Sequence, residues 1–337
     1  MNNRPIPSVA IDVMGGETGF ENVLKGAYLA YETVKYRPVF VGDEFLIKDY
    51  IIKIDPDNSM DAEIIHAPKK IEMSDLPVWA LLKKEESSLH KAFKAVKEGR
   101  ADSVVSAGNS GAIMTIAIRI LGRLEGINRP GLAATIPTVK GRCVLIDIGA
   151  NVDCKAINLY QFAIMGSEFA KAFLGITRPR VAILSNGEEA SKGNSVTKKA
   201  AYLLKRHSLL DFKGYIEGHE IFNGEADVIV CDGFVGNILL KTMEGLVSNL
   251  VLNFKKNIFE FFGLGIDPSL LVKKGGFENF FKEFDYNEYG GVPLLGINGK
   301  CIIAHGRSNE RAMKNAILSA IKYASLNLNL NMERKLL

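Results

Sequence analysis

The sequence contains few cysteines, and they lie far apart. Only four occur in 337 residues, Cys143, Cys154, Cys231 and Cys301, with no C-x-x-C pair and no histidine at ligand spacing. Neither a zinc site nor a disulfide framework is therefore predicted. Three of the four stand in strand-like apolar runs, which is typical of buried free thiols in a reducing compartment.

Targeting and membrane-spanning segments are also missing. No stretch reaches the roughly 18 consecutive apolar residues that a spanning helix needs, so we expect any membrane contact to be peripheral. The N-terminal segment MNNRPIPSVAIDVMGG has neither a charged region followed by a long apolar region nor a cleavage-like site. We therefore expect a cytoplasmic protein.

Three common catalytic motifs are absent as well. The segment MGGETG lacks the G-x-G-x-x-G spacing, and no G-x-x-x-x-G-K-[ST] sequence occurs, which disfavours nicotinamide and ATP. The segment GNSGA around Ser110 is not a G-x-S-x-G nucleophile elbow. The net charge of +4 is too small for a nucleic-acid footprint. These absences leave a globular protein with no predicted cofactor, metal or nucleic-acid partner.

What the sequence does contain is a regular alternation of short β-branched runs with stretches of helical period. This alternation predicts an α/β fold in which crossover helices join parallel strands and cover both faces of a sheet. No linker or repeat divides the series, so we expect a single domain over 1–337. The predicted strands are 8–13, 37–42, 62–67, 102–107, 132–137, 143–148, 180–185, 226–231 and 301–306.

Residues 246–289 interrupt the alternation. A helical run breaks at Gly263–Pro268 and resumes, which predicts an inserted helical hairpin. Eight of the 18 phenylalanines fall between Phe254 and Phe284. The hairpin could form a dimer core, or its tip at Phe261 and Phe262 could enter a membrane interface with the neighbouring lysines on anionic lipid. The sequence leaves both interpretations open.

The turns that follow the predicted strands are unusually rich in glycine and asparagine. In an open parallel sheet, ligands gather at the carboxyl ends of the strands, where loops lead into helix N-termini. Glycine lets the backbone approach an anion closely, and asparagine, serine and lysine supply donors. Six such turns together predict a phosphate-holding basin. They are 14–19, 108–111, 149–153, 186–194, 232–237 and 306–308.

Longer segments carry a specific resemblance. IDVMGGETGFENVLKGA, SAGNSGA, DIGANVDCKAINLYQFAIMGSEFA, LSNGEEASKGN, VCDGFVGNILLKTMEG and GVPLLGINGKCIIAHGRSN occur in that order over nearly the whole chain. This set resembles the PlsX-type acyl-carrier-protein:phosphate acyltransferases. One departure is Glu17, where the family usually has aspartate, and Thr18 and Gly19 also differ from the usual pattern.

The resemblance implies a fold, a reaction and a set of partners. The implied fold is a Rossmann-like three-layer αβα domain related to phosphotransacetylases and isocitrate-dehydrogenase-like proteins. The implied reaction converts an acyl-carrier-protein thioester and inorganic phosphate into acyl phosphate, without cofactor or metal. A homodimer is implied too, together with visits to the inner face of the cell membrane. There the acyl phosphate would pass to a membrane-bound glycerol-3-phosphate acyltransferase for phospholipid synthesis.

The candidate site residues follow from this reaction. A thioester is an activated acyl donor and phosphate is already an anionic nucleophile, so positioning and charge stabilisation can suffice. We expect His305, with Lys241, Asp232 and Asn237, to form the acyl-transfer centre, His305 donating a proton to sulfur or stabilising the oxyanion. Two further sets complete the site. The phosphate-binding set is Gly108, Asn109, Ser110, Asn186, Lys192, Gly193 and Asn194, and the substrate-loop set is Asp12, Gly15, Gly16, Asn151, Gly233, Gly306 and Ser308.

A basic helical face and two rival functions complete the sequence-based expectations. Lys198, Lys199, Lys205 and Arg206 recur at helical spacing and could dock an acidic carrier protein, although a solvated helix face gives the same pattern. One rival function is a short-chain phosphotransacetylase that uses acyl-coenzyme A. The other is a non-catalytic lipid-surface scaffold built on the hairpin.

Overall fold

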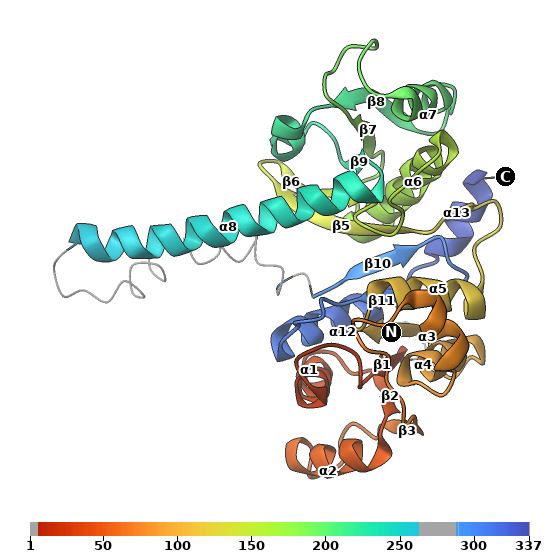
Figure 1. Cartoon of the computed structure of the whole chain (residues 1–337), viewed down its shortest axis with the longest axis vertical. Coiled ribbons are helices and arrows are strands. Elements are labelled where there is room, and N and C mark those ends of the chain that lie inside the picture. Colours follow the sequence, from red (N-terminus) through yellow and green to blue (C-terminus); the bar gives the residue numbers. More distant parts are fainter. Residues whose placement is uncertain (1–5, 263–287, 289, 337) are drawn as a thin grey trace.

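The protein is described by a computed structural model covering residues 6–262, 288 and 290–336. Its centre is an eleven-stranded sheet with the order β3-β2-β1-β4-β11-β10-β5-β6-β9-β7-β8, which runs through two lobes (Figure 1). The strands are β1 (Ser8–Asp12), β2 (Arg37–Gly42), β3 (Glu63–His66), β4 (Ser103–Ser106), β5 (Gly131–Thr138), β6 (Gly141–Ile146), β7 (Arg180–Leu184), β8 (Asp211–Ile216), β9 (Val228–Val230), β10 (Val292–Leu295) and β11 (Cys301–Ile303).

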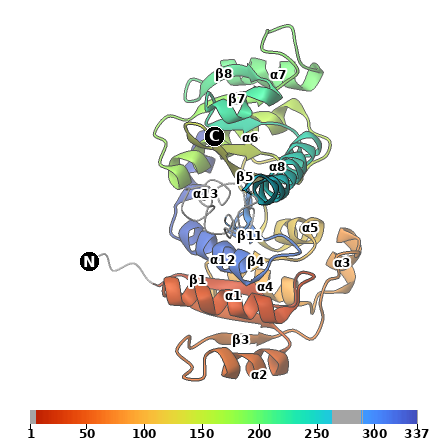
Figure 2. The same cartoon turned by 90° about the vertical axis from the view of Figure 1, so that its left-hand side faces the viewer.

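Helices cover both faces of this sheet, as Figures 1 and 2 show. One apolar cluster packs α1, α2, α6, α7, α12 and α13 on one face, and a second packs α3, α4, α5 and the start of α8 on the other. The predicted three-layer, mostly parallel fold is confirmed. The helices are α1 (Phe20–Thr33), α2 (Glu44–Ile54), α3 (Pro77–Lys83), α4 (Ser88–Lys97), α5 (Ser110–Leu121), α6 (Ala156–Phe169), α7 (Ser195–Lys205), α8 (Gly233–Phe262), α12 (Glu310–Ala324) and α13 (Leu328–Leu336), with a π-helix η1 (Ala170–Leu174) and a 3-10 helix η2 (Gly218–Asn223).

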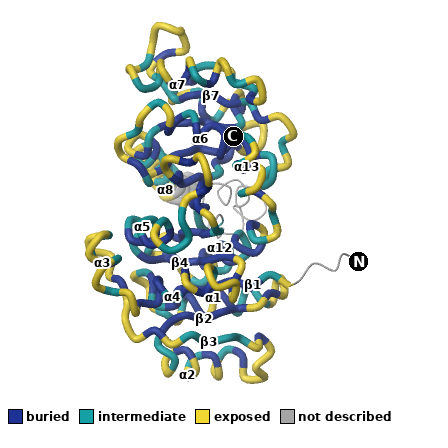
Figure 3. The backbone as a smooth tube through the Cα atoms, turned by 90° about the vertical axis from the view of Figure 1, so that its right-hand side faces the viewer, coloured by how far each residue is buried: buried dark blue, intermediate teal, exposed yellow. Residues whose placement is uncertain are grey.

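Burial on both faces explains why the central strands are apolar runs without alternation. All five residues of β1 are buried, and all three residues of β9 are buried. Figure 3 shows the buried segments passing through the middle of both lobes, with exposed segments at the periphery. A strand between two helical layers has no solvent face, so period-two alternation is not needed.

The two lobes contain parallel strands that run in opposite senses. Strands β3, β2, β1, β4 and β11 are mutually parallel, as are β6, β9, β7 and β8. Between the groups, β10 is antiparallel to β11 and to β5, and β5 is antiparallel to β6. Three successive antiparallel steps therefore reverse the direction of the carboxyl ends from one lobe to the other.

The sheet forks where the lobes meet. Leu294 and Leu295 of β10 pair with Leu132 and Gly131 of β5, whereas Val292 and Pro293 pair only with β11. Beyond Leu132, strand β5 continues with β6, from Ala133 to Thr138. In Figure 1, β5 and β10 diverge, and α8 passes across the opening before it projects from the body of the protein. The fork creates the space in which the candidate site lies.

Three sequence-based expectations differ from the structure. The strand regions 132–137 and 143–148 form an antiparallel hairpin, β5–β6, and are not joined by a crossover helix. Strands β8 and β10 were not predicted, because β8 carries charges and a glycine while β10 is only four residues long. The first helical run of the predicted hairpin, from residue 246, is the second half of a longer helix, since α8 runs without a break from Gly233 to Phe262.

Candidate active site

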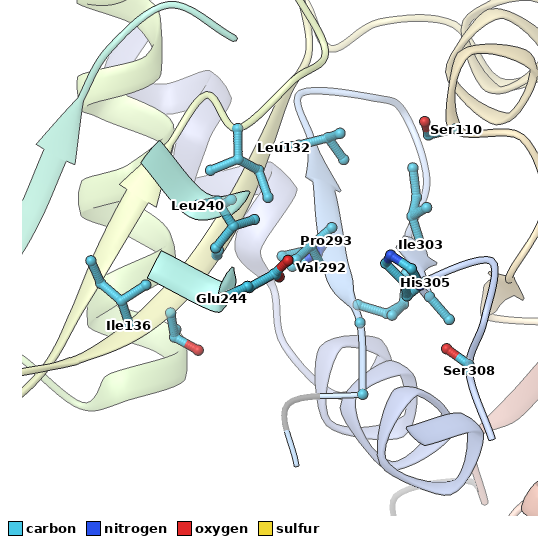
Figure 4. A pocket seen from close by; sticks show the side chains of 18 of the residues that line it. Ser110, Leu132, Ile136, Leu240, Glu244, Val292, Pro293, Ile303, His305 and Ser308 are labelled. Atoms are coloured by element: carbon cyan, nitrogen blue, oxygen red, sulfur yellow. The ribbon is translucent and has the colours of Figure 1, made fainter. Parts of the chain in front are cut away.

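A cavity of about 740 Å³ lies in the sheet fork, between the turns of one lobe and the start of α8 (Figure 4). Its polar end is formed by residues that follow β1, β4 and β11. Its remaining walls are largely apolar and come from β5, β10, α8 and the segments around η1 and η2. The apolar lining includes Leu132, Ala134, Ile136, Phe173, Phe222, Leu240, Met243, Val292 and Ile303.

The turns after β1, β4 and β11, which we call the three-turn cluster (residues 14–18, 107–110 and 305–308), are bonded to each other at the polar end. The Glu17 N–H donates to the Gly306 carbonyl at 2.8 Å, and the Thr18 hydroxyl donates to the Ser308 carbonyl at 2.7 Å. Gly16 has a φ of +95°, and a Cβ there would lie 3.2 Å from both Ala107 and the Gly306 carbonyl. Only glycine fits this close approach, so Gly16 permits the cluster to form.

Asp12 stabilises the three-turn cluster from the end of β1. It is buried at the end of β1 and accepts a hydrogen bond from the Ser106 hydroxyl at 2.6 Å. The same hydroxyl accepts from the Gly108 N–H at 3.1 Å, and a Cβ at Gly15 would lie 2.6 Å from the Asp12 carboxylate. Burial raises the pKa of Asp12. Asp12 and Gly15 therefore lie behind the cavity wall and shape it.

Two side chains of the cluster are placed to contact a ligand. The Ser308 hydroxyl is buried, lines the cavity, and has no hydrogen-bond partner in the part of the chain that the structure describes. Since buried polar groups normally have partners, this hydroxyl points to a bound polar group. His305 also lines the cavity, and its Nδ1 accepts from the Arg307 N–H at 3.1 Å. In the neutral ring the proton is thus on Nε2, which makes Nε2 a donor.

The N-terminal half of α8 supplies the opposite wall. Asn237, Lys241 and Glu244 recur at helical spacing and all line the cavity. Burial raises the pKa of Glu244, while the charges of His305 and Lys241 act in the opposite direction. Figure 4 shows Glu244 reaching from α8 toward β10.

The turns after β6 and β9 fix the start of α8. Asp232 caps the helix by accepting from the Val235 N–H at 2.8 Å. Gly233 packs so closely that a Cβ would lie 2.7 Å from the Asn151 carbonyl. The Asn151 side chain donates to Pro130 and Asp147 at 2.7 and 2.8 Å. Asp232, Gly233 and Asn151 therefore hold α8 in place and are not among the described residues that line the cavity.

Asn109 also has a local structural role. Its side-chain oxygen caps α5 by accepting from the Ala112 N–H at 3.1 Å, and its amide nitrogen donates to the carbonyls of Met73 and Asp75, at 2.9 Å each. Its neighbours Gly108 and Ser110 do line the cavity. The structure thus separates Asn109 from the two residues with which it was grouped.

The turn from Asn186 to Asn194 lies elsewhere, so the prediction that all six turns form one basin is wrong. Among the described residues that line the cavity, none comes from this turn. In Figure 1 the chain between β7 and α7 lies at the top of the molecule, away from the space between the lobes. Asn186 accepts from the Gly193 N–H at 2.9 Å, and Asn194 caps α7. Lys192 is exposed beside Gly187.

The predicted basic face lies on α7 and just beyond it. Lys198, Lys199, Lys205 and Arg206 are all exposed. Lys198 and Lys199 share a shallow surface pocket with Tyr202 and with Lys155, which immediately precedes α6. Lys155 was missed because it stands 43 residues before Lys198 in the sequence. Only the packing of α6 against α7 brings these lysines together.

The projecting part of α8 ends at Phe262. The side chains of Phe261 and Phe262 lie outside the described residues, as does the rest of the predicted hairpin through residue 287. Among the helices that the structure describes, none combines the length and the apolar run needed to cross a membrane. The described residues also hold no group of three or more His, Cys, Asp or Glu placed to bind a metal ion.

Sequence reasoning missed four charged residues that line the cavity. Arg307 lies between two predicted site residues and pairs with Glu17 at 3.3 Å. Glu244 stands three residues after Lys241, on the same helical face, so its spacing was a usable signal. Arg142 of β6 and Glu288 carry no local sequence signal, because they reach the cavity only through long-range folding of the chain.

The fold is shared with phosphotransacetylases. The structure resembles EutD phosphotransacetylase from Staphylococcus aureus with a TM-score of 0.61 at 17% sequence identity, covering 95% of this chain and 94% of that one. It also resembles a putative 4-hydroxythreonine-4-phosphate dehydrogenase from Salmonella typhimurium, with a TM-score of 0.55 at 14% identity and 95% and 99% coverage. By its fold, the protein therefore belongs to the class of two-lobed α/β proteins, and its cavity lies between the lobes.

Sequence comparison gives the family. Residues 8–331 match the family model described as fatty acid synthesis protein. The chain is 46% identical to the phosphate acyltransferase of Campylobacter concisus, over 97% of this chain and 98% of the relative. It is 43% identical to that of Geotalea daltonii, over 97% and 94%. The chain belongs to the PlsX-type phosphate acyltransferase family, as its sequence motifs predicted.

Proposed function

We propose that the protein transfers a fatty acyl group from an acyl-carrier-protein thioester to inorganic phosphate, giving acyl phosphate and the free carrier thiol. The single observation that carries the proposal is the buried Ser308 hydroxyl without a partner among the described residues, which faces a cavity beside His305. A hydroxyl donor at the polar end of an otherwise apolar cavity suits an anionic nucleophile that meets an acyl chain.

Phosphate would bind at the three-turn cluster. Ser308, Ser110 and the Gly108 backbone supply uncharged groups, and Ser110 begins α5, whose N-terminal N–H groups favour an anion. Arg307 and Lys241 supply positive charge. In this proposal Arg307 and Lys241 replace Lys192 as the cations that bind phosphate.

The thioester carbonyl would lie between His305 and the bound phosphate. Attack by a phosphate oxygen forms a C–O bond and places negative charge on the carbonyl oxygen before the C–S bond breaks. The Nε2–H group of His305 and the Asn237 amide are suitable donors to that oxygen. Preorganised donors of this kind typically contribute about 10²–10³ to the rate constant.

The apolar walls favour a long acyl chain over acetyl. One wall of the cavity is apolar and is formed by Leu132, Ala134, Ile136, Leu240 and Met243. A short acyl group would leave this wall in contact with solvent. Each methylene that such a wall buries contributes about 0.8 kcal/mol, or about fourfold in kcat/KM. A short-chain phosphotransacetylase that uses acyl-coenzyme A would show no such gain.

Each proposed partner would contact a different part of the protein. An acidic carrier protein would dock on the α7 face, where Lys155 joins Lys198 and Lys199. A second copy of this chain would cover the exposed apolar stripe Phe234, Ile238, Leu246 and Leu250 of α8, each at least 50% exposed here. The tip around Phe261 and Phe262 would visit the inner face of the membrane, where a glycerol-3-phosphate acyltransferase consumes the product.

The test is direct. Purified protein, acyl-carrier-protein thioester and phosphate should release free thiol and form acyl phosphate, both only when phosphate is present. Donors from acetyl to palmitoyl, each on the carrier protein and on coenzyme A, separate the proposal from the short-chain rival. Absence of phosphate-dependent thiol release with every donor would leave the non-catalytic scaffold as the better account.

A further inference from the structure

Glu244 occupies an unusual position for a carboxylate. It lies on the cavity face of α8, one turn beyond Lys241 and two turns beyond Asn237. Leu240 of the same helix and Val292 and Pro293 of β10 border it, as Figure 4 shows. An acidic side chain at the edge of an anion-binding cavity repels the substrate, so its presence requires a chemical reason.

The other two cavity glutamates have evident partners. Glu17 pairs with Arg307 at 3.3 Å, and Glu288 lies against Arg311 of α12. Glu244 forms no ion pair with any residue that the structure describes. Burial raises its pKa, and the charges of His305 and Lys241 oppose that rise. The charged and titratable groups that line the same cavity are Glu17, Arg142, Lys241, Glu288, His305 and Arg307. Among the described carboxyl groups that line the cavity, Glu244 is therefore the one without an ion-pair partner.

The reaction in the proposed function requires that a proton change place. Hydrogen phosphate carries one proton, the acyl phosphate product is the dianion, and the leaving sulfur departs as a thiolate that must become a thiol. A P–O–C bond forms, the C–S bond breaks, and one proton passes from the phosphate to the sulfur. No oxidant, reductant or further reactant is needed.

We propose, resting on that proposed function, that the Glu244 carboxyl group relays this proton from the phosphate to the departing sulfur. It takes the proton as the new C–O bond makes the P–OH group more acidic, and it delivers the proton as the C–S bond breaks. An alkyl thiol has a pKa of about 8.5, well above that of an acyl phosphate P–OH group, so a carboxyl group between them can accept and donate. Burial raises the pKa of Glu244 and so brings it closer to the pKa of the thiol.

The experiment compares two leaving groups in the full-length protein. Glu244→Gln keeps the size and polarity of the side chain but cannot exchange the proton. With the dodecanoyl thioester of N-acetylcysteamine, we expect kcat to fall about 100-fold or more, with KM for phosphate changed less than about threefold. The thiolate of 4-nitrothiophenol needs no proton to leave. With its dodecanoyl thioester, the fold-decrease in kcat caused by Glu244→Gln should therefore be at least tenfold smaller.

Controls separate this role from a structural one. Glu244→Asp should recover part of kcat, and Glu32→Gln, an exposed change on α1, should match the wild type in kcat and in melting temperature. Two results would overturn the relay: Glu244→Gln within threefold of wild type, or an equal loss with both thioesters. A wild-type protein inactive with both donors and with the acyl-carrier-protein thioester would instead refute the proposed function.

Discussion

Two turns of similar composition have different roles in this protein. The turn after β11, from His305 to Ser308, and the turn after β7, from Asn186 to Asn194, both follow a buried strand and both contain glycine. In the first, a buried hydroxyl faces a cavity with no partner among the described residues. In the second, both asparagines bond to the turn itself or to α7. A donor-rich turn is a ligand site only when its donors are not already used locally.

Removing the imidazole should have the largest effect. We expect His305→Ala to lower kcat about 10²–10³-fold, because the oxyanion loses a fixed donor. Lys192→Ala, in the other turn, should stay within about threefold of wild type when assayed with a small-molecule thioester. Steady-state thiol release measures both. Equal losses in the two variants would refute the distinction between the turns.

Removing one hydroxyl should have the next largest effect. Ser308→Ala is expected to raise KM for phosphate about 10-fold or more, since a hydrogen bond to a charged group is worth about 1.5–3 kcal/mol. Asn186→Ala should leave KM for phosphate unchanged, because its oxygen bonds the Gly193 N–H. Initial rates over a phosphate series measure this, and an unchanged KM in Ser308→Ala would remove Ser308 from the phosphate site.

Charge reversal on α7 should act on the carrier and not on phosphate. The double change Lys198→Glu and Lys199→Glu is expected to raise KM for a carrier-bound acyl donor about 10-fold, because these exposed lysines would attract an acidic surface. KM for a small-molecule thioester is the matched control and should not move. Added salt should reduce the difference between wild type and variant. A flat salt response would argue against electrostatic docking.

Removing a helix cap should have the smallest effect, and on stability alone. Asn194→Ala loses the side-chain bonds to the N–H groups of Val196 and Thr197, at 2.9 Å each. We expect the free energy of unfolding to fall by about 1 kcal/mol, with kcat for a small thioester unchanged. Urea denaturation measures the free energy of unfolding, and the thiol-release assay measures kcat. A drop in kcat would mean that the turn has a catalytic role after all.

The sequence by itself determined the fold class, the family and much of the polar end of the cavity. Apolar runs buried on both faces, with helical periods between them, are enough to predict a three-layer sheet. Gly108, Ser110, Asn237, Lys241, His305, Gly306 and Ser308 were predicted as site residues and do line the cavity.

Only the tertiary structure decided which turns share a cavity. Strand direction depends on pairing partners distant in sequence, and three antiparallel steps through β10 and β5 reverse it between the lobes. The turn after β7, which lies three strands beyond β5 in the sheet, is separated from the turns after β1, β4 and β11, although it too contains glycine. The same long-range pairing opens the fork that brings Arg142 and Glu244 to the site. Local composition specifies which groups a turn offers, and chain topology specifies what they face.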